Sequence, residues 1–229
     1  LVSPWEIVLV VIKEVKPLDP NTFEFVANET NALILDVRHQ DDFSNGHIPN
    51  SIFIGLSGAF APWVGALILD YKQPILLVTP IGKEEETIIR LSRVGYDNTI
   101  GYLNGGFDSW KNSEKEYDTI NSILADQLET IITTKDNLVF DVRKPGEYIA
   151  EHIENVSSTP LDFINENFNE YPKNETFYIH CAGGYRSVIA ASILKSRGYH
   201  NVVDIKGGFA AIKQTDIKTT NYVCPSTLK

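Results

Sequence analysis

The chain has 229 residues, enough for two domains of ordinary size. Hydrophobic residues make up 43% and charged residues 22%, which is the balance of a folded protein and not of a disordered one. The formal net charge of −10 argues against a nucleic-acid partner, because phosphate binding needs clustered Lys and Arg. The two cysteines, Cys181 and Cys224, argue against a disulfide-stapled secreted domain and favour the reducing cytoplasm.

The apolar run of residues 7–12 is the first element expected along the chain. It is too short to cross a membrane, so we expect no membrane partner. It also lacks the basic region and the cleavage site of a signal peptide, and a buried strand or helical turn is the simpler interpretation. The chain contains no methionine, even at position 1, and we therefore expect a further segment upstream of Leu1.

Strands and helices alternate along the rest of the chain. Asp19 and Pro20 predict a helix start, with Asp as the cap and Pro at the first helical position. Nearly continuous apolar runs predict parallel strands that are covered on both faces. In the second half we expect strands over 138–142, 177–180 and 202–205, and a helix over 188–197 that ends at Gly198. This alternation predicts an α/β fold with mostly parallel sheets flanked by helices.

The chain repeats itself, with four blocks in the same order in both halves. The first-half blocks are residues 33–38, 46–51, 95–96 and 103–107, which return as 138–143, 151–156, 198–199 and 205–209. Two homologous domains in tandem is the economical interpretation. The polar segment 113–118 follows the last expected helix of the first half, and we place the boundary there, giving domains 1–114 and 115–229.

Residues 181–187, Cys-Ala-Gly-Gly-Tyr-Arg-Ser, are the stretch most indicative of chemistry. They follow an expected strand and lead into an expected helix, so Cys181 lies where backbone N–H groups and the positive end of a helix converge. Such a site favours a thiolate and binds the anionic group that the sulfur attacks. In open parallel sheets, ligand sites lie at the carboxyl ends of the strands, where Cys181 is placed.

Four features together carry a family resemblance: the Asp-Val-Arg strand end, the His-Ile element, the Cys-x-x-Gly-x-Arg loop and the Gly-Gly-Phe helix start. In this order, over about residues 17–213, both halves resemble rhodanese-like domains. The resemblance implies two tandem rhodanese-like domains, each with a mostly parallel sheet flanked by helices. It also implies a loop cysteine that accepts a sulfane sulfur as a persulfide and passes it to a thiophilic acceptor.

A narrower resemblance concerns the first half. Residues 61–68 and 82–87 are similar to the non-catalytic rhodanese repeat of bacterial proteins that begin with a metallo-β-lactamase-fold domain. This resemblance implies an upstream iron-dependent persulfide dioxygenase as a fused partner. The chain itself holds no His-x-His-x-Asp motif, and we expect no metal site and no cofactor in it.

Cys181 is the expected nucleophile, and its thiolate would attack the outer sulfur of a donor. The backbone N–H groups from Ala182 to Ser187 would stabilise the thiolate and then the persulfide. Gly183 and Gly184 would let the loop curl without a Cβ clash. The expected donors are thiosulfate or glutathione persulfide, and the expected acceptors are a thiol or a cyanide-like nucleophile.

Three further loop residues have two interpretations each. Arg186 could bind an anionic donor or pair with a carboxylate that makes the loop rigid. Ser187 could cap the following helix or hydrogen-bond the sulfur. Tyr185 could line the entrance to the site or simply pack. Cys224, in the C-terminal tail, could resolve a persulfide, form a disulfide with Cys181 or be idle, and idle is the default.

The first half has no cysteine at the matching place, where Thr79 stands. Thr79 cannot form a persulfide, and residues 84–86 are three successive glutamates that would repel an anionic substrate. We therefore interpret the first domain as a scaffold or docking module, with a residual ligand site as the minor alternative.

Features shared by both halves are more simply explained by the fold than by chemistry. Arg38 and Arg143 each follow a buried Asp-Val strand end and predict a structural ion pair with a nearby carboxylate, with substrate contact as the less favoured interpretation. His47 and His152 also recur in both halves. His180 adjoins Cys181, but neighbouring side chains on a strand point to opposite faces, so we do not expect it to act as the base.

A sulfurtransferase is the leading hypothesis for the function. A sulfur-carrier or docking module of a larger persulfide dioxygenase fusion is the alternative. A phosphatase is less favoured, because four residues separate Cys181 from Arg186 where phosphatase relatives carry five, and no general-acid Asp is evident.

Overall fold

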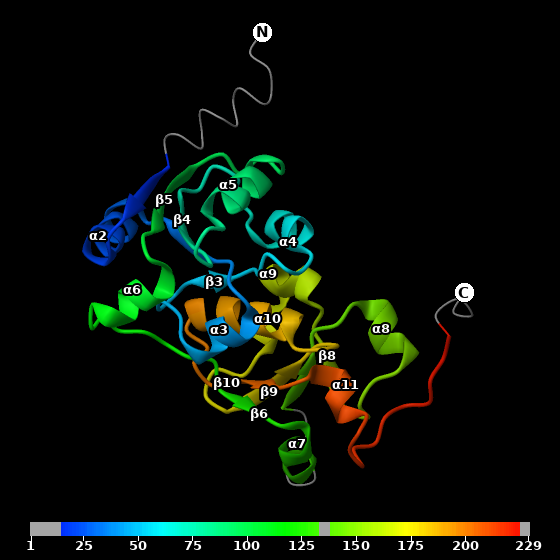
Figure 1. Cartoon of the computed structure of the whole chain (residues 1–229). Coiled ribbons are helices and arrows are strands. Elements are labelled where there is room, and N and C mark those ends of the chain that lie inside the picture. The colour runs from blue at the N-terminus through cyan, green and yellow to red at the C-terminus, as the bar shows by residue number, and fades with distance from the viewer. Residues whose placement is uncertain (1–14, 133–137, 225–229) are drawn as a thin grey trace. The chain divides into compact units, whose positions relative to one another are not determined.

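The computed structural model describes residues 15–132 and 138–224, so the apolar run predicted at residues 7–12 lies outside the described residues. The chain divides into two compact units between Thr119 and Ile120 (Figure 1). The polar segment 113–118, in which we predicted the boundary, lies wholly within the first unit. There, Asp118 exchanges backbone hydrogen bonds of 2.9 and 2.8 Å with His47. Within the described ranges, no helix combines the length and the apolar character that crossing a bilayer requires.

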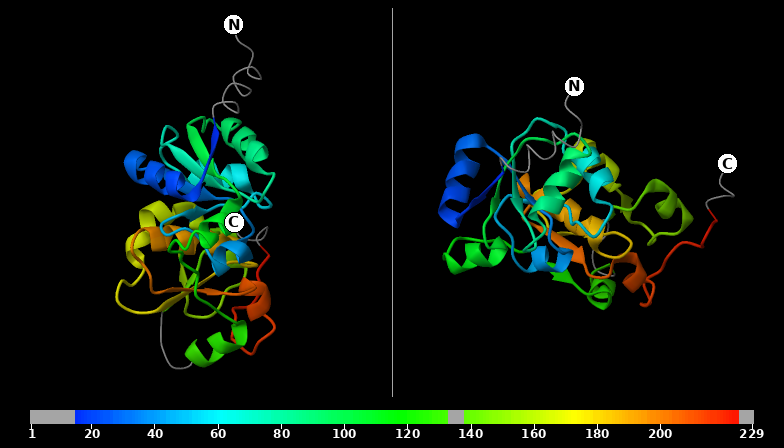
Figure 2. Two further views of the ribbon diagram at one scale, coloured as in Figure 1. Left: turned by 60° about the vertical axis from the view of Figure 1, so that its left-hand side comes forward. Right: turned by 45° about the horizontal axis from the view of Figure 1, so that its top comes forward.

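The first unit is a five-stranded parallel sheet in the order β1-β5-β4-β2-β3. Its strand β4 is central and wholly buried, and helices flank the sheet (Figure 2). The elements are β1 (Lys16–Leu18), α2 (Pro20–Thr30), β2 (Leu33–Asp36), α3 (Gln40–Asn45), β3 (Ile52–Phe53), α4 (Phe60–Leu67), β4 (Ile75–Val78), α5 (Glu84–Ser92), β5 (Thr99–Leu103) and α6 (Gly106–Asn112).

The second unit repeats this architecture, with the parallel order β6-β10-β9-β7-β8. Its elements are β6 (Ser122–Ile123), α7 (Ala125–Ile132), β7 (Val139–Asp141), α8 (Pro145–Ala150), β8 (Ser157–Ser158), the 3-10 turn Leu161–Phe163, α9 (Ile164–Asn167), the 3-10 turn Phe168–Glu170, β9 (Phe177–His180), α10 (Tyr185–Ser196), β10 (Val202–Ile205) and α11 (Gly208–Ile212). The predicted α/β fold with two tandem parallel sheets is confirmed.

The local signals in the sequence act largely as expected. The Asp19 carboxylate accepts hydrogen bonds from the N–H groups of Asn21 and Thr22, at 3.0 and 3.2 Å, and caps α2. The strands predicted at 177–180 and 202–205 are β9 and β10. The helix predicted from residue 188 begins three residues earlier, at Tyr185. The left-handed backbone of Gly184, with φ of 104°, turns the chain directly from the loop into helical geometry.

A buried Asp–Arg pair closes the carboxyl end of one strand in each unit, as predicted. The Arg143 guanidinium donates to both carboxylate oxygens of Asp141, with its shortest bond 2.6 Å, and to the backbone oxygen of Glu151 at 2.7 Å. It also lies 3.9 Å over the ring of Phe209. One side chain therefore ties β7 to the end of α8 and to the start of α11.

The first unit has the same pair. Arg38 donates to Asp36, with its shortest bond 2.6 Å, and to the backbone oxygen of Gly46 at 2.7 Å, and it lies 4.2 Å over the ring of Phe107. Because this unit has no loop cysteine, the pair serves the fold.

The recurrent histidines serve the fold as well. His47 and His152 each place Nδ1 on a backbone oxygen four residues earlier, at 2.9 and 2.7 Å, and stack on the aromatic ring of that same residue, Phe43 or Tyr148.

Replacing Asp141 by Ala removes one partner of a buried ion pair and leaves the Arg143 charge without its counterion. We expect the free energy of unfolding of the second unit to fall by about 3–5 kcal/mol, measured by urea denaturation. The exposed Asp162 provides the matched control, and Asp162→Ala should change stability by no more than about 0.5 kcal/mol. Equal effects of the two variants would show that the pair does not hold the unit together.

Candidate active site

Cys181 is the first residue after β9, the central strand of the second sheet, and therefore lies at the sheet edge where parallel α/β folds bind ligands. Its side chain is buried, with 1% of the residue exposed. The Gly184 N–H donates to Sγ at 3.1 Å. The Ser187 hydroxyl lies 3.5 Å from Sγ and also 3.3 Å from the backbone oxygen of Gly184. Both groups are donors that stabilise an anionic sulfur.

The other predicted loop residues form the rim of this site. Gly183 is exposed and has open space where a Cβ would lie. Ala182 is half-buried and holds the loop through its backbone oxygen. Tyr185 is half-buried and begins α10. Of the predicted donors from Ala182 to Ser187, the structure directs the Gly184 N–H and the Ser187 hydroxyl at the sulfur.

The start of α11 is hydrogen-bonded to the backbone of the cysteine loop. The N–H groups of Phe209 and Ala210 donate to the backbone oxygens of Cys181 and Ala182, at 2.7 and 3.1 Å. This approach requires glycine at position 208, where φ is 55° and a Cβ would lie 2.4 Å from the Cys181 oxygen. The Gly-Gly-Phe motif is thus the backbone clamp of the cysteine loop, a role that the sequence pattern alone did not reveal.

His180 supports the loop from inside the sheet. It is fully buried, with Nδ1 3.3 Å from the backbone oxygen of Cys181 and Nε2 3.9 Å from the Asp141 carboxylate. The ring nitrogens thus face a carbonyl and a carboxylate and not the sulfur, which agrees with the expectation that His180 is not the base. Burial lowers the pKa of His180 and keeps the ring neutral. The first unit has Val78 at the equivalent place.

Arg186 pairs with a carboxylate that sequence analysis missed. Its two terminal nitrogens donate to both oxygens of Glu147, at 2.5 and 2.8 Å, across 39 residues of sequence. Glu147 also accepts the Lys144 N–H at 3.1 Å and so caps α8. The hydrogen bonds from Arg186 hold the pKa of Glu147 below its usual value. Of the two interpretations of Arg186, the geometry favours the one in which it makes the loop rigid.

A comparison of the two repeats could have identified Glu147. The first unit has Glu84 where the second has Arg186, and Asp42 where the second has Glu147. Both members of the pair differ between the repeats. At these two positions, a carboxylate and an arginine stand together only in the unit that has the cysteine, and this difference is the signal of contact.

In the first unit, a side chain of the loop itself binds the equivalent backbone N–H. Gly82, the counterpart of Gly184, donates its N–H to the Glu84 carboxylate at 3.2 Å. Thr79 stands at the place of Cys181, and Pro80, which follows it, has no N–H to offer. The glutamates thus disfavour an anionic ligand by occupying its donor as well as by their charge.

A groove of about 450 Å³ adjoins the cysteine loop, and its lining residues include Glu147, Ala182, Phe209 and Tyr222. Tyr222 belongs to the C-terminal tail, which runs beside α8. There, the Val223 N–H donates to the Ala150 backbone oxygen at 2.8 Å. Cys224 follows as an exposed thiol that is not joined to the buried Cys181. Among the described residues, no three His, Cys, Asp or Glu side chains come together to hold a metal ion.

Known proteins resemble both halves of the chain. The family model described as a rhodanese-like domain matches residues 22–113 and again residues 124–215. A sulfurtransferase of Allochromatium vinosum is 31% identical over 93 residues, which are 40% of this chain and 87% of that protein. A putative sulfur carrier protein of Bacillus subtilis is 29% identical over 99 residues, 43% of this chain and 54% of that protein. The chain thus spans about half the length of the second relative.

Among solved structures, a rhodanese-like domain protein from Staphylococcus aureus is 33% identical, with a TM-score of 0.40. The match covers 43% of this chain and 97% of that one.

Adding a methyl group at Gly208 should displace the cysteine loop, because the new Cβ would meet the Cys181 backbone oxygen at 2.4 Å. In a Cys224→Ser background, we expect Gly208→Ala to raise the rate of Cys181 alkylation by iodoacetamide several-fold. Gly106→Ala in the first unit is the matched control. Gly106 also has a positive φ, so an alanine there costs a similar backbone strain of about 1–3 kcal/mol. This glycine lies outside the unit that has the cysteine. An unchanged alkylation rate in Gly208→Ala would contradict the clamp.

The lowered pKa of His180 predicts a pH dependence of stability. The unfolded chain binds this proton near its ordinary pKa of about 6.5, and the folded chain binds it only at lower pH. Stability should therefore fall as the pH drops below about 6.5, by up to about 1.4 kcal/mol per pH unit from this group. His180→Val, which installs the residue of the first unit, should flatten that slope in urea titrations. Parallel curves for the two proteins would overturn the assignment.

Proposed function

Both halves of this chain belong to the rhodanese-like domain family, and from that premise we propose that it is a sulfurtransferase carrying sulfane sulfur as a persulfide on Cys181. The observation that supports this role most is the position of the sulfur: a buried thiol at the carboxyl end of the central strand, with the Gly184 N–H and the Ser187 hydroxyl directed at it. The first unit, which has no cysteine, then contributes structure or docking.

The proposed reaction has two steps. The Cys181 thiolate attacks the outer sulfur of thiosulfate or of a small-thiol persulfide such as glutathione persulfide. A new S–S bond forms, and sulfite or the small thiolate leaves with the electron pair of the broken bond. A thiolate or a cyanide-like acceptor then attacks the outer sulfur, and the Cys181 thiolate is the leaving group. In each step, the Gly184 N–H and the Ser187 hydroxyl stabilise the sulfur that carries negative charge.

In this scheme Arg186 is a positioning residue. Its bidentate pair with Glu147 connects the first turn of α10 to the first turn of α8 and keeps residues 181–187 in one conformation. The same pair argues against the phosphatase alternative, since a guanidinium that is already bound to a carboxylate on both nitrogens is poorly placed to cradle a phosphate. The short loop, with four residues between Cys181 and Arg186, argues in the same direction.

The groove beside the loop is the proposed binding place for the small-thiol part of a donor or acceptor. Its walls include Phe209, Ala182 and Tyr222, and the charged residues that line it include Lys213, whose ammonium is bound to the Glu151 carboxylate at 2.7 Å. Such an apolar groove with a charged rim suits a thiol-bearing molecule better than it suits bare thiosulfate. The cytoplasm is the proposed compartment, because a reducing environment keeps Cys181 as a thiol.

The alternative is that the chain is a sulfur carrier or docking module, with a protein as the donor. One relative is named as a putative sulfur carrier protein, and the first unit without a cysteine fits a docking role. Fusion to a metallo-β-lactamase-fold dioxygenase remains a prediction from the resemblance of residues 61–68 and 82–87.

Intact-mass measurement tests the function directly. After separate incubation with thiosulfate and with glutathione persulfide, we expect the wild type to gain the mass of one sulfur atom and to lose it again on addition of cyanide or a thiol. Cys181→Ser should gain nothing, whereas Cys224→Ser should gain the sulfur like the wild type. The absence of a gain from either donor would contradict the free enzyme and favour a carrier that is loaded by another protein.

A further inference from the structure

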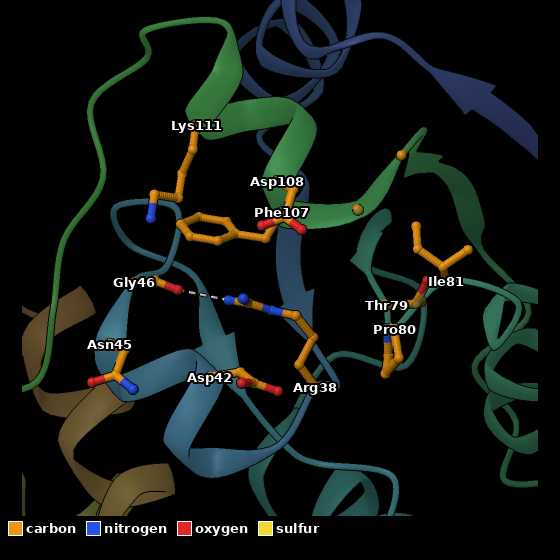
Figure 3. A pocket seen from close by; sticks show the side chains of 12 residues that line it. Arg38, Asp42, Asn45, Gly46, Thr79, Pro80, Ile81, Phe107, Asp108 and Lys111 are labelled. Atoms are coloured by element: carbon orange, nitrogen blue, oxygen red, sulfur yellow. Dashed lines mark hydrogen bonds between the residues drawn. The ribbon is translucent and has the colours of Figure 1, made fainter.

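The first unit has a pocket of about 330 Å³ at the place that corresponds to the active site of the second unit (Figure 3). It lies between α3, the loop after β4 and the start of α6, all within residues 38–111. Its size is at the lower end of the range typical of small-molecule sites. The question is what such a pocket can bind in a unit that has no nucleophile.

An anion is disfavoured there. The Gly82 N–H, which corresponds to the donor on the catalytic sulfur, is already bound to the Glu84 carboxylate. Pro80 removes another possible donor. Asp42 and Asp108 add two carboxylates to the lining of the pocket. A dianion such as thiosulfate therefore lacks the backbone N–H that the cysteine loop would offer it and meets two carboxylates in the pocket, so it is disfavoured as a ligand.

The pocket has nevertheless gained polar groups compared with its counterpart. Asp108 stands where the second unit has Ala210, and Asn45 stands where it has Ala150. Asp42 and Asp108 form no ion pair within the part of the chain that the structure describes. Lys111 also lines the pocket, and Figure 3 shows these charged groups around the Phe107 ring and the Arg38 guanidinium. The pocket therefore offers both signs of charge.

The Thr79 hydroxyl gives an independent indication of a ligand. Thr79 lines the pocket and is 2% exposed, and its Oγ1 has no hydrogen-bond partner among the described residues. Burying a hydroxyl without a partner is unfavourable, so such groups usually bind something. Thr79 is the counterpart of Cys181, whose sulfur is the proposed point of reaction in the second unit.

We propose that this pocket binds a small zwitterion of amino-acid size. The ammonium group of the ligand pairs with the carboxylates of Asp42 and Asp108, and its carboxylate pairs with Lys111. The Thr79 hydroxyl forms a hydrogen bond with the ligand and so gains a partner. The site is distinct from the cysteine site, because it lies entirely within the first unit.

Calorimetric titration of the full chain in a Cys181→Ala background tests this proposal separately from the sulfur chemistry. The probes are L-serine and glycine as zwitterions, and acetate, methylamine and thiosulfate as ions of one sign. We expect the zwitterions to bind at least about tenfold more tightly than acetate or methylamine, since each ion can use only one half of the site. Thiosulfate should not displace bound L-serine, because the loop that takes this anion lies in the second unit.

Variants of the lining residues locate the site. Asp108→Asn and Thr79→Val should each weaken L-serine binding about tenfold, whereas Thr79→Ser, which keeps the hydroxyl, should bind like the parent. The exposed Asp97, outside the pocket, gives the control Asp97→Asn, which should also bind like the parent. Absence of zwitterion binding, binding insensitive to Asp108→Asn and Thr79→Val, or displacement of bound L-serine by thiosulfate would each overturn the proposal.

Discussion

The structure of each unit depends on one buried ion pair between an aspartate at the end of a strand and the arginine two residues later. In the second unit, Arg143 binds the Asp141 carboxylate, the backbone at Glu151 and the face of Phe209 at the same time. A charge with so little solvent around it is tolerable only because every one of these contacts is present. The pair therefore fixes three segments that surround the cysteine loop: the end of β7, the end of α8 and the start of α11.

Upon this shared frame, the two units have diverged through a few side chains. The second unit places a thiol at the end of its central strand and pairs Arg186 with Glu147 beside it. The first unit has acids at both positions of that pair, and one of them, Glu84, accepts the Gly82 N–H. The loop of the second unit favours a bound anion, whereas the loop of the first unit carries a carboxylate of its own at the same place. The frame persists in both units because it is independent of what the loop carries.

The fold, and the place of Cys181 at the end of β9, could be predicted from sequence because their signals are local or repeated. The apolar runs marked β9 and β10, and the spacing of Cys181, Gly184 and Arg186 marked the loop. Contacts between distant segments could not be predicted in the same way. Glu147 is 39 residues from its partner Arg186, and the clamp at Gly208 is a steric fact that appears only when α11 is placed against Cys181. The polar pocket of the first unit likewise depends on side chains from three elements meeting.

The depth of Cys181 has a consequence for a loaded form of the protein. With 1% of the residue exposed, the cysteine sulfur itself is out of reach of most partners. A second sulfur attached to it would lie about 2 Å beyond the cysteine sulfur. The outer sulfur, which is the one transferred to an acceptor, would then be the atom that other molecules reach first. Under oxidative stress, an oxidant would meet this expendable outer atom first, while the cysteine sulfur remained sheltered beneath the Gly184 amide.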